Sequence, residues 1–416
     1  ATFDVPAIFG AIAQKTGIEV KGKYGILLPS IRFYREGMAA LLITLLLGVV
    51  ISTIIYYCVL SVKKRQPYST NTAYIVSFGV IIPACFLLPY ALVAMSNIQS
   101  TVTRQLICLP FVMYAFRCLE AFFGFSPPTA TSSPLKFALY YTMPVESAYN
   151  KKDGSVEKAT AQDIQRLFFV MVRTAIIMSI CFSFLLFYGF EPFRSRNAVG
   201  DTLMLKDYLA LVHLGNCFIA AIMFQLGLTF TGAYLACLRY ALTGDKASDL
   251  MRNPVLEATS PSDFWGRRWN KVAHGFLKRG VFKPLRKYTS SFVASLGAFF
   301  ASGLFHEYIV HLVFIYKREP RPIYTSSCPT EILEYKAQIG YNMAFFAWNG
   351  VLIVIEKLMR KHQIMKSIGS ALPQSFITVL IIMTALPVGH WLSNPYIRGG
   401  HFYDVQQGFP MVVKIA

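Results

Sequence analysis

Long apolar runs alternate with short charged segments along most of this chain. Runs that contain no Asp, Glu, Lys or Arg include residues 38–60, 66–103, 208–238 and 337–355. A helix needs roughly 20 apolar residues to cross the hydrocarbon core of a bilayer, whereas a helix of a soluble protein keeps at least one polar face. The pattern therefore predicts an all-α fold, a polytopic bundle of membrane-spanning helices.

We predict about eight spans, with these approximate bounds: 38–60, 72–95, 104–125, 167–190, 208–238, 288–316, 337–357 and 373–393. The third span is the weakest, because Arg117 and Glu120 interrupt it. The fifth is longer than a core of ~30 Å requires, so we expect it to tilt, to kink or to continue along the membrane surface. Residues 1–37 are expected to be an extramembrane segment, and residues 396–416 a C-terminal tail.

Composition and charge support a membrane protein and give no support for nucleic-acid binding. Hydrophobic residues make up 55% of the chain and charged residues 15%, against about 25% charged residues in soluble domains. The net charge of +19 is spread over loops beside the spans, where basic residues set topology and meet anionic lipids. Because the loops that include 239–287 are the richer in Lys and Arg, we expect that side of the membrane to be cytosolic.

The segment 259–287 carries an amphipathic pattern. Ser260, Pro261 and Asp263 form the start signal of a helix. One face of that helix is apolar and follows helical spacing: Trp265, Trp269, Val272 and Phe276. Another face is basic: Arg267, Lys271, His274 and Lys278, with Asn270 beside it. Such a helix lies in the membrane interface. It is either a plain anchor or the place where cations meet a phosphate-bearing ligand.

The span 288–316 contains the ionisable pair His306–Glu307. Ionisable residues inside a membrane helix are costly and mark functional sites by default. His306 lies 18 residues after Tyr288, about 27 Å along a helix, so we expect it well inside the membrane. Ser302 precedes it by one turn on the same face. The alternative is a structural role, in which the serine packs and the pair forms hydrogen bonds.

No metal site is predicted. The stretch HEYIVH resembles the zinc motif H-E-x-x-H, but His306 and His311 are five positions apart, about 140° around a helix. Glu307 and His311 have the spacing to pair instead. His213 is interpreted as a packed helix contact, and His390 has no assigned role. The chain lacks a nucleophile elbow, a Walker loop and a dinucleotide fingerprint, so a buried histidine leaves proton relay, ligand binding or general base catalysis.

Two stretches resemble a known family. PSDFWGRRWNKVAHGFLKRGVFKPLRK, followed by ASGLFHEYI, resembles plant wax synthases of the membrane-bound O-acyltransferase superfamily. The resemblance covers roughly 132–395, an acyltransferase core, whereas the helices in 38–131 match only in hydropathy. One departure is Asn349-Gly350, where plant members usually have His-Gly.

The resemblance implies an acyl-CoA-dependent O-acyltransferase that esterifies a long-chain fatty alcohol in a buried chamber. His306 would be the general base, Asn270 would steady the thioester or the developing charge, and Glu307 would position His306. Residues implied in substrate binding are Trp265, Arg267, Arg268, Trp269, Lys271 and Ser302. Acyl-CoA is a co-substrate, and no cofactor is expected.

The acceptor and the setting follow less directly from the resemblance. Diacylglycerol and a sterol are alternative acceptors, and a non-catalytic membrane subunit or a proton-relay transporter is an alternative function. The expected setting is the endoplasmic reticulum membrane with 239–287 in the cytosol. Expected partners are acyl-CoA, a lipid alcohol and membrane lipid, with homo-oligomers compatible with the fold.

Overall fold

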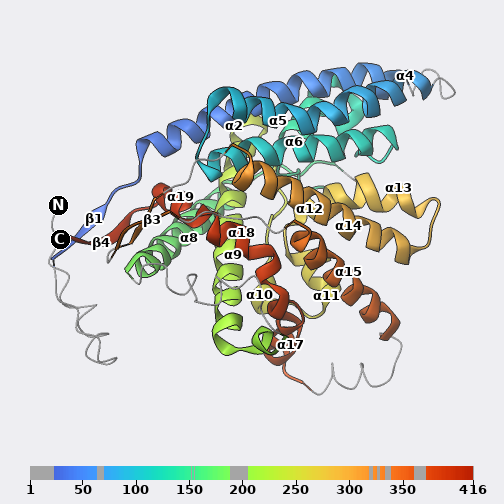
Figure 1. Cartoon of the computed structure of the whole chain (residues 1–416). Helices are drawn as coiled ribbons and strands as arrows, with labels where there is room; N and C mark the ends of the chain where they lie inside the picture. The colour runs from blue at the N-terminus through green and yellow to red at the C-terminus, as the bar shows by residue number, and fades with distance from the viewer. Residues whose placement is uncertain are drawn as a thin grey trace.

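The computed structural model is dominated by long apolar helices (Figure 1). It describes residues 23–62, 70–150, 152–153, 155–187, 205–317, 322–325, 328–332, 339–359 and 372–415. Within this part of the chain, seven helices are long and apolar enough to cross a membrane: Ile31–Leu60, Asn71–Ser96, Thr101–Phe122, Ala161–Leu185, Leu211–Thr243, Ser291–Ile315 and Tyr341–Met359. Each matches one of the first seven predicted spans, so the expected polytopic all-α membrane bundle is confirmed.

The eighth predicted span is a bent pair of helices. α17 (Gln374–Ala385) and the short helix η9 (Leu386–Val388) are followed by α18 (His390–Arg398), and the two arms meet at 62°. Pro387 has no N–H to donate to the preceding turn, which is a frequent cause of a sharp kink. The absence of charge in the run 367–397 predicted one straight span, and the bend falls at Pro387 within that run.

The first span starts earlier than expected. α2 (Ile31–Ile55) begins seven residues before position 38, and Ser30 caps it by accepting a hydrogen bond from the Phe33 N–H. Its first turns hold Arg32 and Glu36, whose side chains pair at 2.7 Å. A pair four residues apart supports a helical turn, so the helix continues beyond the uncharged run into the charged sequence before it.

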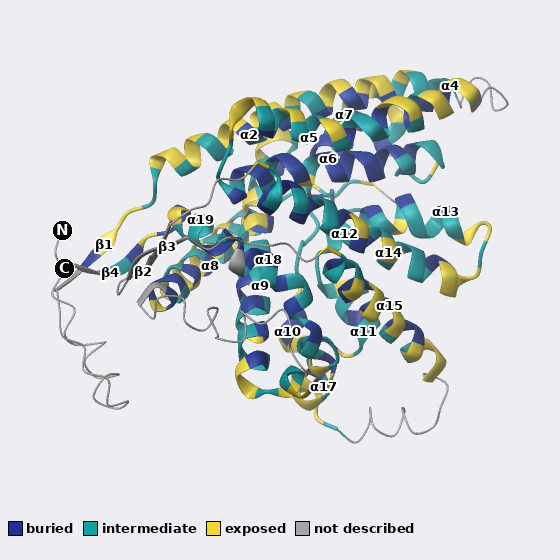
Figure 2. Cartoon of the chain, viewed as in Figure 1, coloured by how far each residue is buried: buried dark blue, intermediate teal, exposed yellow. Residues whose placement is uncertain are grey.

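The third span, α6 (Thr101–Phe122), is the most buried helix of the core (Figure 2). Its charged residues do not weaken it, because each is paired. Arg104 donates hydrogen bonds to the carbonyls of Leu312, Tyr316 and other residues at the end of the sixth span. Arg117 donates to the carbonyls of Tyr140, Tyr141 and Met143. Hydrogen bonds lower the cost of burying such charges, although Nε of Arg117 and Oε1 of Glu120 have no hydrogen-bond partner.

Two small antiparallel pairs of strands complete the described fold. β1 (Lys23–Leu27) pairs with β4 (Met411–Ile415), with Lys23 opposite Ile415. β2 (Pro322–Thr325) pairs with β3 (Cys328–Ile332). The first pair joins residues from opposite ends of the sequence, and the Val412 N–H donates to the Ser183 hydroxyl to fasten β4 to α8 (Ala161–Phe187). Residues 396–416 are therefore, in their described part, integrated into the fold.

The helices that carry the candidate site lie side by side (Figure 1). α14 (Ser291–Val310) continues into η8 (His311–Ile315) and packs along α15 (Tyr341–Met359). Close approach is allowed by Gly303, where a side chain would collide with the Met343 backbone. The short helix α12 (Lys271–Leu277) packs against both α6 and α14, and it connects the polar loops to the membrane interior.

Candidate functional site

His306 lies on α14 in an aromatic environment. Its imidazole is centred 4.3 Å from the Phe346 ring on α15 and 4.0 Å from Phe305. The Nδ1 atom is 2.7 Å from the carbonyl oxygen of Ser302. A carbonyl oxygen can only accept, so Nδ1 carries the proton and the neutral ring keeps its lone pair on Nε2. In this arrangement Nε2 is the ring nitrogen without a proton.

Ser302 binds His306 through its backbone carbonyl rather than through its hydroxyl. Its side chain is 5% exposed and sits in the helix interface, and its carbonyl is the group that holds His306. Residues one turn apart in a helix are neighbours, so this contact follows directly from the spacing seen in the sequence. The role expected for Ser302 in substrate binding has no direct support from these contacts.

The carboxylate of Glu307 binds the start of α15. Its Oε1 accepts hydrogen bonds from the backbone N–H groups of Gly340 and Met343, at 3.0 and 3.1 Å. These amides belong to the first turn of α15, where N–H groups lack partners within the helix. Glu307 therefore caps α15 and fixes it to α14. Within the described residues the structure records no pairing of Glu307 with His311, so that expectation is not met.

The predicted continuous amphipathic helix is wrong. The segment forms short pieces: α11 (Pro261–Asp263), η6 (Phe264–Arg268), α12, η7 (Lys278–Phe282) and α13 (Lys283–Arg286). The break falls at Trp269, which is extended, and Asn270, which has a left-handed φ of 33°. Asparagine tolerates this conformation because its short amide hydrogen-bonds locally. The predicted start is confirmed, since the Ser260 hydroxyl accepts from the Asp263 N–H at 3.1 Å.

Asn270 is the N-cap of α12. Its Oδ1 accepts a hydrogen bond from the Ala273 N–H at 3.1 Å, as capping asparagines do. This leaves the Nδ2 amide hydrogens as donors directed elsewhere. Trp269 stacks on Phe264, with ring centroids 5.4 Å apart. Trp269 therefore ends η6 and Asn270 begins α12. The break between the two helices determines the orientation of the Asn270 side chain.

Trp265 links this segment to the neighbourhood of His306. Its indole N–H donates to Asn349 Oδ1 at 3.0 Å, and its ring lies 5.8 Å from that of Phe346. Phe346 is the residue that meets the imidazole. Asn349, which stands where plant wax synthases usually have histidine, is buried and serves as the acceptor for Trp265. Trp265 thus packs against the aromatic residue that contacts His306.

Arg267 and Arg268 are held by internal carboxylates. Arg268 pairs with Asp263 at 2.7 Å and with Glu257 at 2.6 Å, and Arg267 pairs with Asp263 at 2.9 Å. Burial opposes ionisation of Asp263, but hydrogen bonds from Arg268 and Thr259 hold its pKa below the ordinary value. Arg267 remains 71% exposed. Both ion pairs of Arg268 are made within the protein, so this side chain stabilises the fold of the segment.

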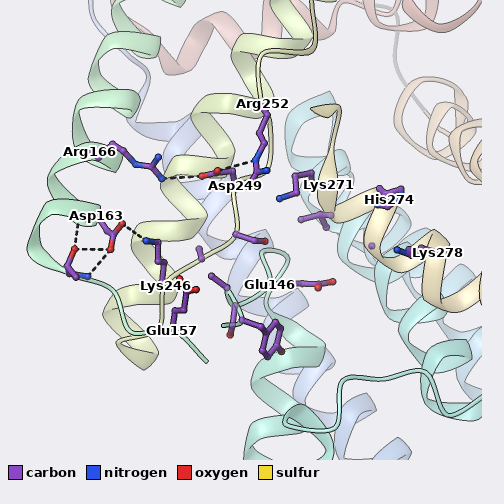
Figure 3. Close-up of a pocket in the computed structure, with 18 of the residues that line it drawn as sticks. Glu146, Glu157, Asp163, Arg166, Lys246, Asp249, Arg252, Lys271, His274 and Lys278 are labelled. Atoms are coloured by element: carbon purple, nitrogen blue, oxygen red, sulfur yellow. Dashed lines mark hydrogen bonds and ion pairs between the residues drawn. The ribbon is translucent and has the colours of Figure 1, made fainter. Parts of the chain in front are cut away.

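A polar cavity of about 930 Å³ lies beside α12 (Figure 3). Its lining comes from the loops near 146–163 and 246–252, from α8 and from α12. The basic residues of the lining are Arg166, Lys246, Arg252, Lys271, Lys278 and Arg279, and the acidic ones are Glu146, Glu157, Asp163 and Asp249. Of these basic residues, Lys271 was expected in substrate binding and Lys278 on the same basic face, whereas Arg166, Lys246 and Arg252 come from segments that sequence spacing could not bring to this place.

The acidic residues neutralise some of the cations in this cavity. Lys246 pairs with Asp163, Arg166 and Arg252 pair with Asp249, and Arg279 pairs with Glu146. Among the described residues, Lys271 and Lys278 form no ion pair. Burial, together with Arg252, lowers the pKa of Lys271. The two lysines are therefore the groups on the α12 side that remain available for an anionic ligand.

His274 lies between these two lysines on the cavity face of α12. Burial and the neighbouring Lys278, Arg279 and Lys271 lower its pKa to about 4, so it is neutral near pH 7. The opposite face of α12 is apolar, and Phe276 lies 6.1 Å from Phe305, the neighbour of His306. One short helix thus separates a polar cavity from the surroundings of His306.

Over part of its length the chain is similar to known proteins. Residues 248–325 match the model of the membrane bound O-acyl transferase family. The chain is 26% identical over 219 residues to "Probable long-chain-alcohol O-fatty-acyltransferase 2" of Arabidopsis thaliana, covering 51% of this chain and 54% of the relative. It is 28% identical over 187 residues to "Long-chain-alcohol O-fatty-acyltransferase" of Simmondsia chinensis, covering 42% and 45%.

A third relative has a different acceptor in its name. The chain is 31% identical over 156 residues to "Acyl-CoA--sterol O-acyltransferase 1" of Arabidopsis thaliana, covering 34% of this chain and 39% of the relative. The chain spans about half the length, or less, of the curated relatives it matches. The family match covers the segment that holds α12, Asn270 and His306. This chain is therefore an integral, multi-pass membrane protein that resembles the membrane bound O-acyl transferase family over residues 248–325 and the long-chain-alcohol O-fatty-acyltransferases over about half of its length.

Proposed function

We propose that this chain transfers a fatty acyl group from acyl-CoA to the hydroxyl of a long-chain alcohol and so makes a wax ester. The observation that carries the proposal is His306, which is held by the Ser302 carbonyl with Nε2 left as the basic atom. Two of the relatives quoted above are named for this activity. A base inside the membrane suits substrates whose chains both prefer lipid.

The reaction needs one base and no acyl-enzyme. Nε2 of His306 takes the proton of the alcohol as its oxygen attacks the thioester carbonyl. The tetrahedral intermediate then collapses, the C–S bond breaks, and the imidazolium returns the proton to the leaving CoA sulfur. The amide of Asn270 would donate to the oxygen that becomes negative, and loss of such a donor costs about 10²–10³ in rate.

The polar cavity fits the charged part of acyl-CoA. Lys271 and Lys278 supply two cations that are not neutralised by carboxylates. Lys271 is the first residue of α12, and Lys278 is the first residue of η7, which follows it. The apolar face of the same helix contacts Phe305 through Phe276. A CoA whose phosphates rest in the cavity would pass its thioester around the start of α12, at Asn270, toward His306.

Aromatic side chains would keep the reacting centre dry. Phe346, Phe305 and Trp265 surround the base and its support. Exclusion of water limits hydrolysis of the thioester. The cavity would face the cytosol, where the basic loops are expected, in the endoplasmic reticulum membrane.

A sterol is the second candidate acceptor. The relative with the highest identity among the three quoted is named as a sterol O-acyltransferase, at 31%. The same base would serve either alcohol, because both offer a hydroxyl on an apolar body. Diacylglycerol is the third acceptor to test.

The test uses the purified full chain in nanodiscs with labelled palmitoyl-CoA. Separate tubes receive hexadecanol, a sterol or diolein, and each is repeated with His306→Ala. We expect ester in the parent and not in the variant, and the productive tube identifies the acceptor. If the parent protein shows a cooperative thermal unfolding transition but releases no CoA with any alcohol, the proposed enzymatic activity is refuted. A non-catalytic membrane subunit is then favoured.

A further inference from the structure

Three metal-ligating residues meet where the bent eighth span contacts α9 (Leu211–Thr243). His213 and Cys217 lie four residues apart on α9, and His390 is the first residue of α18. One ligand atom from each lies within 4.8 Å of the others. All three residues are buried, with exposed fractions of 8%, 5% and 6%. The mechanism proposed above uses none of them.

The separations approach those of a metal coordination shell. The Sγ of Cys217 is 3.8 Å from Nε2 of His213. The carbonyl oxygen of Pro387 is 2.9 Å from that Nε2 and 3.2 Å from Nδ1 of His390. Tetrahedral zinc, with bonds of about 2.0–2.3 Å, sets its ligands roughly 3.3–3.7 Å apart. The widest pair would have to close by about 1 Å.

The chemistry of the group also fits a metal. Two imidazoles and one thiolate are the ligands that zinc prefers. Positions four apart share one face of a helix, so His213 and Cys217 approach a common point without distortion. The backbone N–H of His390 donates to the Cys217 sulfur, an outer contact of the kind that supports a metal-bound thiolate.

Hydrogen bonds to Pro387 are the competing explanation for the two histidines. These hydrogen bonds explain why both imidazole rings lie at one carbonyl oxygen. They do not explain why the Cys217 sulfur lies beside them. Tyr208 closes the group, since it stacks on His213 at 6.1 Å and meets His390 edge-on at 5.0 Å. Tyr208 thus encloses the two imidazole rings on one side.

We propose that His213, Cys217 and His390 bind a structural zinc ion, with the Pro387 carbonyl or a water as the fourth ligand. The ion would fasten the bend between η9 and α18 to α9. Val388, in this bend, packs in the same cluster as Phe345 and Phe346, and Phe346 contacts the base. A metal here would therefore hold the wall of the candidate site without entering its chemistry.

The experiment uses the full chain in detergent, with any purification tag removed and adventitious metal stripped by a weak chelating resin. Elemental analysis should find about one zinc per chain. Replacement by Co²⁺ should give the visible bands of a tetrahedral site and a thiolate-to-cobalt charge-transfer band in the near ultraviolet. Added zinc should also raise the midpoint of thermal unfolding.

Cys217→Ser and His390→Gln are the ligand variants, and Cys237→Ser, on the same helix, is the matched control. Loss of a ligand should weaken zinc affinity by more than the ~10–100-fold that is typical when a residue hydrogen-bonded to a metal ligand is replaced. Cys217→Ser should also abolish the charge-transfer band. The control should behave as the parent does. All these readouts are independent of acyl transfer, and folding of each variant is checked by gel filtration.

Two results would overturn the assignment. One is a folded parent that contains no zinc and gives no cobalt spectrum. The other is a metal content and a zinc-induced rise in unfolding midpoint that persist unchanged in the Cys217→Ser, His390→Gln double variant, which would place the ion elsewhere.

Discussion

Nδ1 of His306 donates to the carbonyl oxygen of Ser302 one helical turn earlier, at 2.7 Å. Because a backbone group fixes the tautomer, the choice of basic nitrogen does not depend on a neighbouring carboxylate. Glu307, the adjacent acid, is occupied with two amides of α15. The base is thus oriented by its own helix, and the acid stabilises the contact between two helices.

Ser302→Ala should leave ester formation within about twofold of the parent, because the carbonyl that holds His306 is retained. His306→Gln, by contrast, should reduce the rate by about 10²–10⁴, the usual contribution of a general base. Initial rates of ester formation at saturating acyl-CoA measure both. A loss of similar size in the two variants would mean that the Ser302 hydroxyl contacts substrate.

Glu307→Ala should destabilise the protein more than Glu307→Gln does. The amide oxygen of glutamine can still accept from Gly340 and Met343, whereas alanine removes the cap, which costs about 0.5–2 kcal/mol at a helix start. Thermal unfolding in nanodiscs measures the difference. If Glu307→Gln abolished activity while keeping the parent's unfolding midpoint, the carboxylate would have a direct part in positioning His306.

Lys271→Ala and Lys278→Ala should raise the KM for acyl-CoA with little change in kcat, because their expected contact is with phosphates distant from the reacting bond. The effect should shrink as salt is added, since exposed charge interactions are screened. Lys287→Ala is the control, being an exposed lysine outside the cavity. Equal effects in all three would indicate general surface charge rather than this cavity.

Acid should destabilise the parent relative to His274→Gln. Burial, with the charges of Lys278, Arg279 and Lys271, lowers the pKa of His274 to about 4 in the folded protein from an ordinary 6.5. Between these values the unfolded chain binds more protons, so stability rises with pH. The difference in unfolding midpoint between the two proteins should therefore be constant above pH 6.5. As pH falls from 6.5 toward 4, the unfolding midpoint of the parent should fall relative to that of His274→Gln. A difference that does not change over this range would contradict the burial of a neutral imidazole.

The spans were predictable because each is an uninterrupted apolar run. The burial of α6 was not, since Arg117 and Glu120 look unfavourable until their partners are known. Glu120 is paired with Arg279 and Tyr140, which lie far from it in sequence. Long-range pairing of this kind leaves no local signal.

The candidate site was predictable in its residues but not in its geometry. His306 and Asn270 were identified from motif and depth, and both remain candidates. The break at Trp269 was missed because the apolar spacing from Trp265 to Phe276 continues in step across it. Arg268 is paired with carboxylates such as Glu257, whereas Lys271 forms no ion pair among the described residues and can meet an anionic ligand. The sequence pattern did not reveal which cation each carboxylate pairs with.

The pairing of β1 with β4 has a consequence for how many times the chain threads the bilayer. Strands hydrogen-bonded edge to edge occupy the same compartment, so the polypeptide between Leu27 and Met411 must make an even number of crossings. The described residues offer seven single helices and one bent pair. For the described residues alone, the number of candidate crossings is even when the two arms around Pro387 count as one crossing.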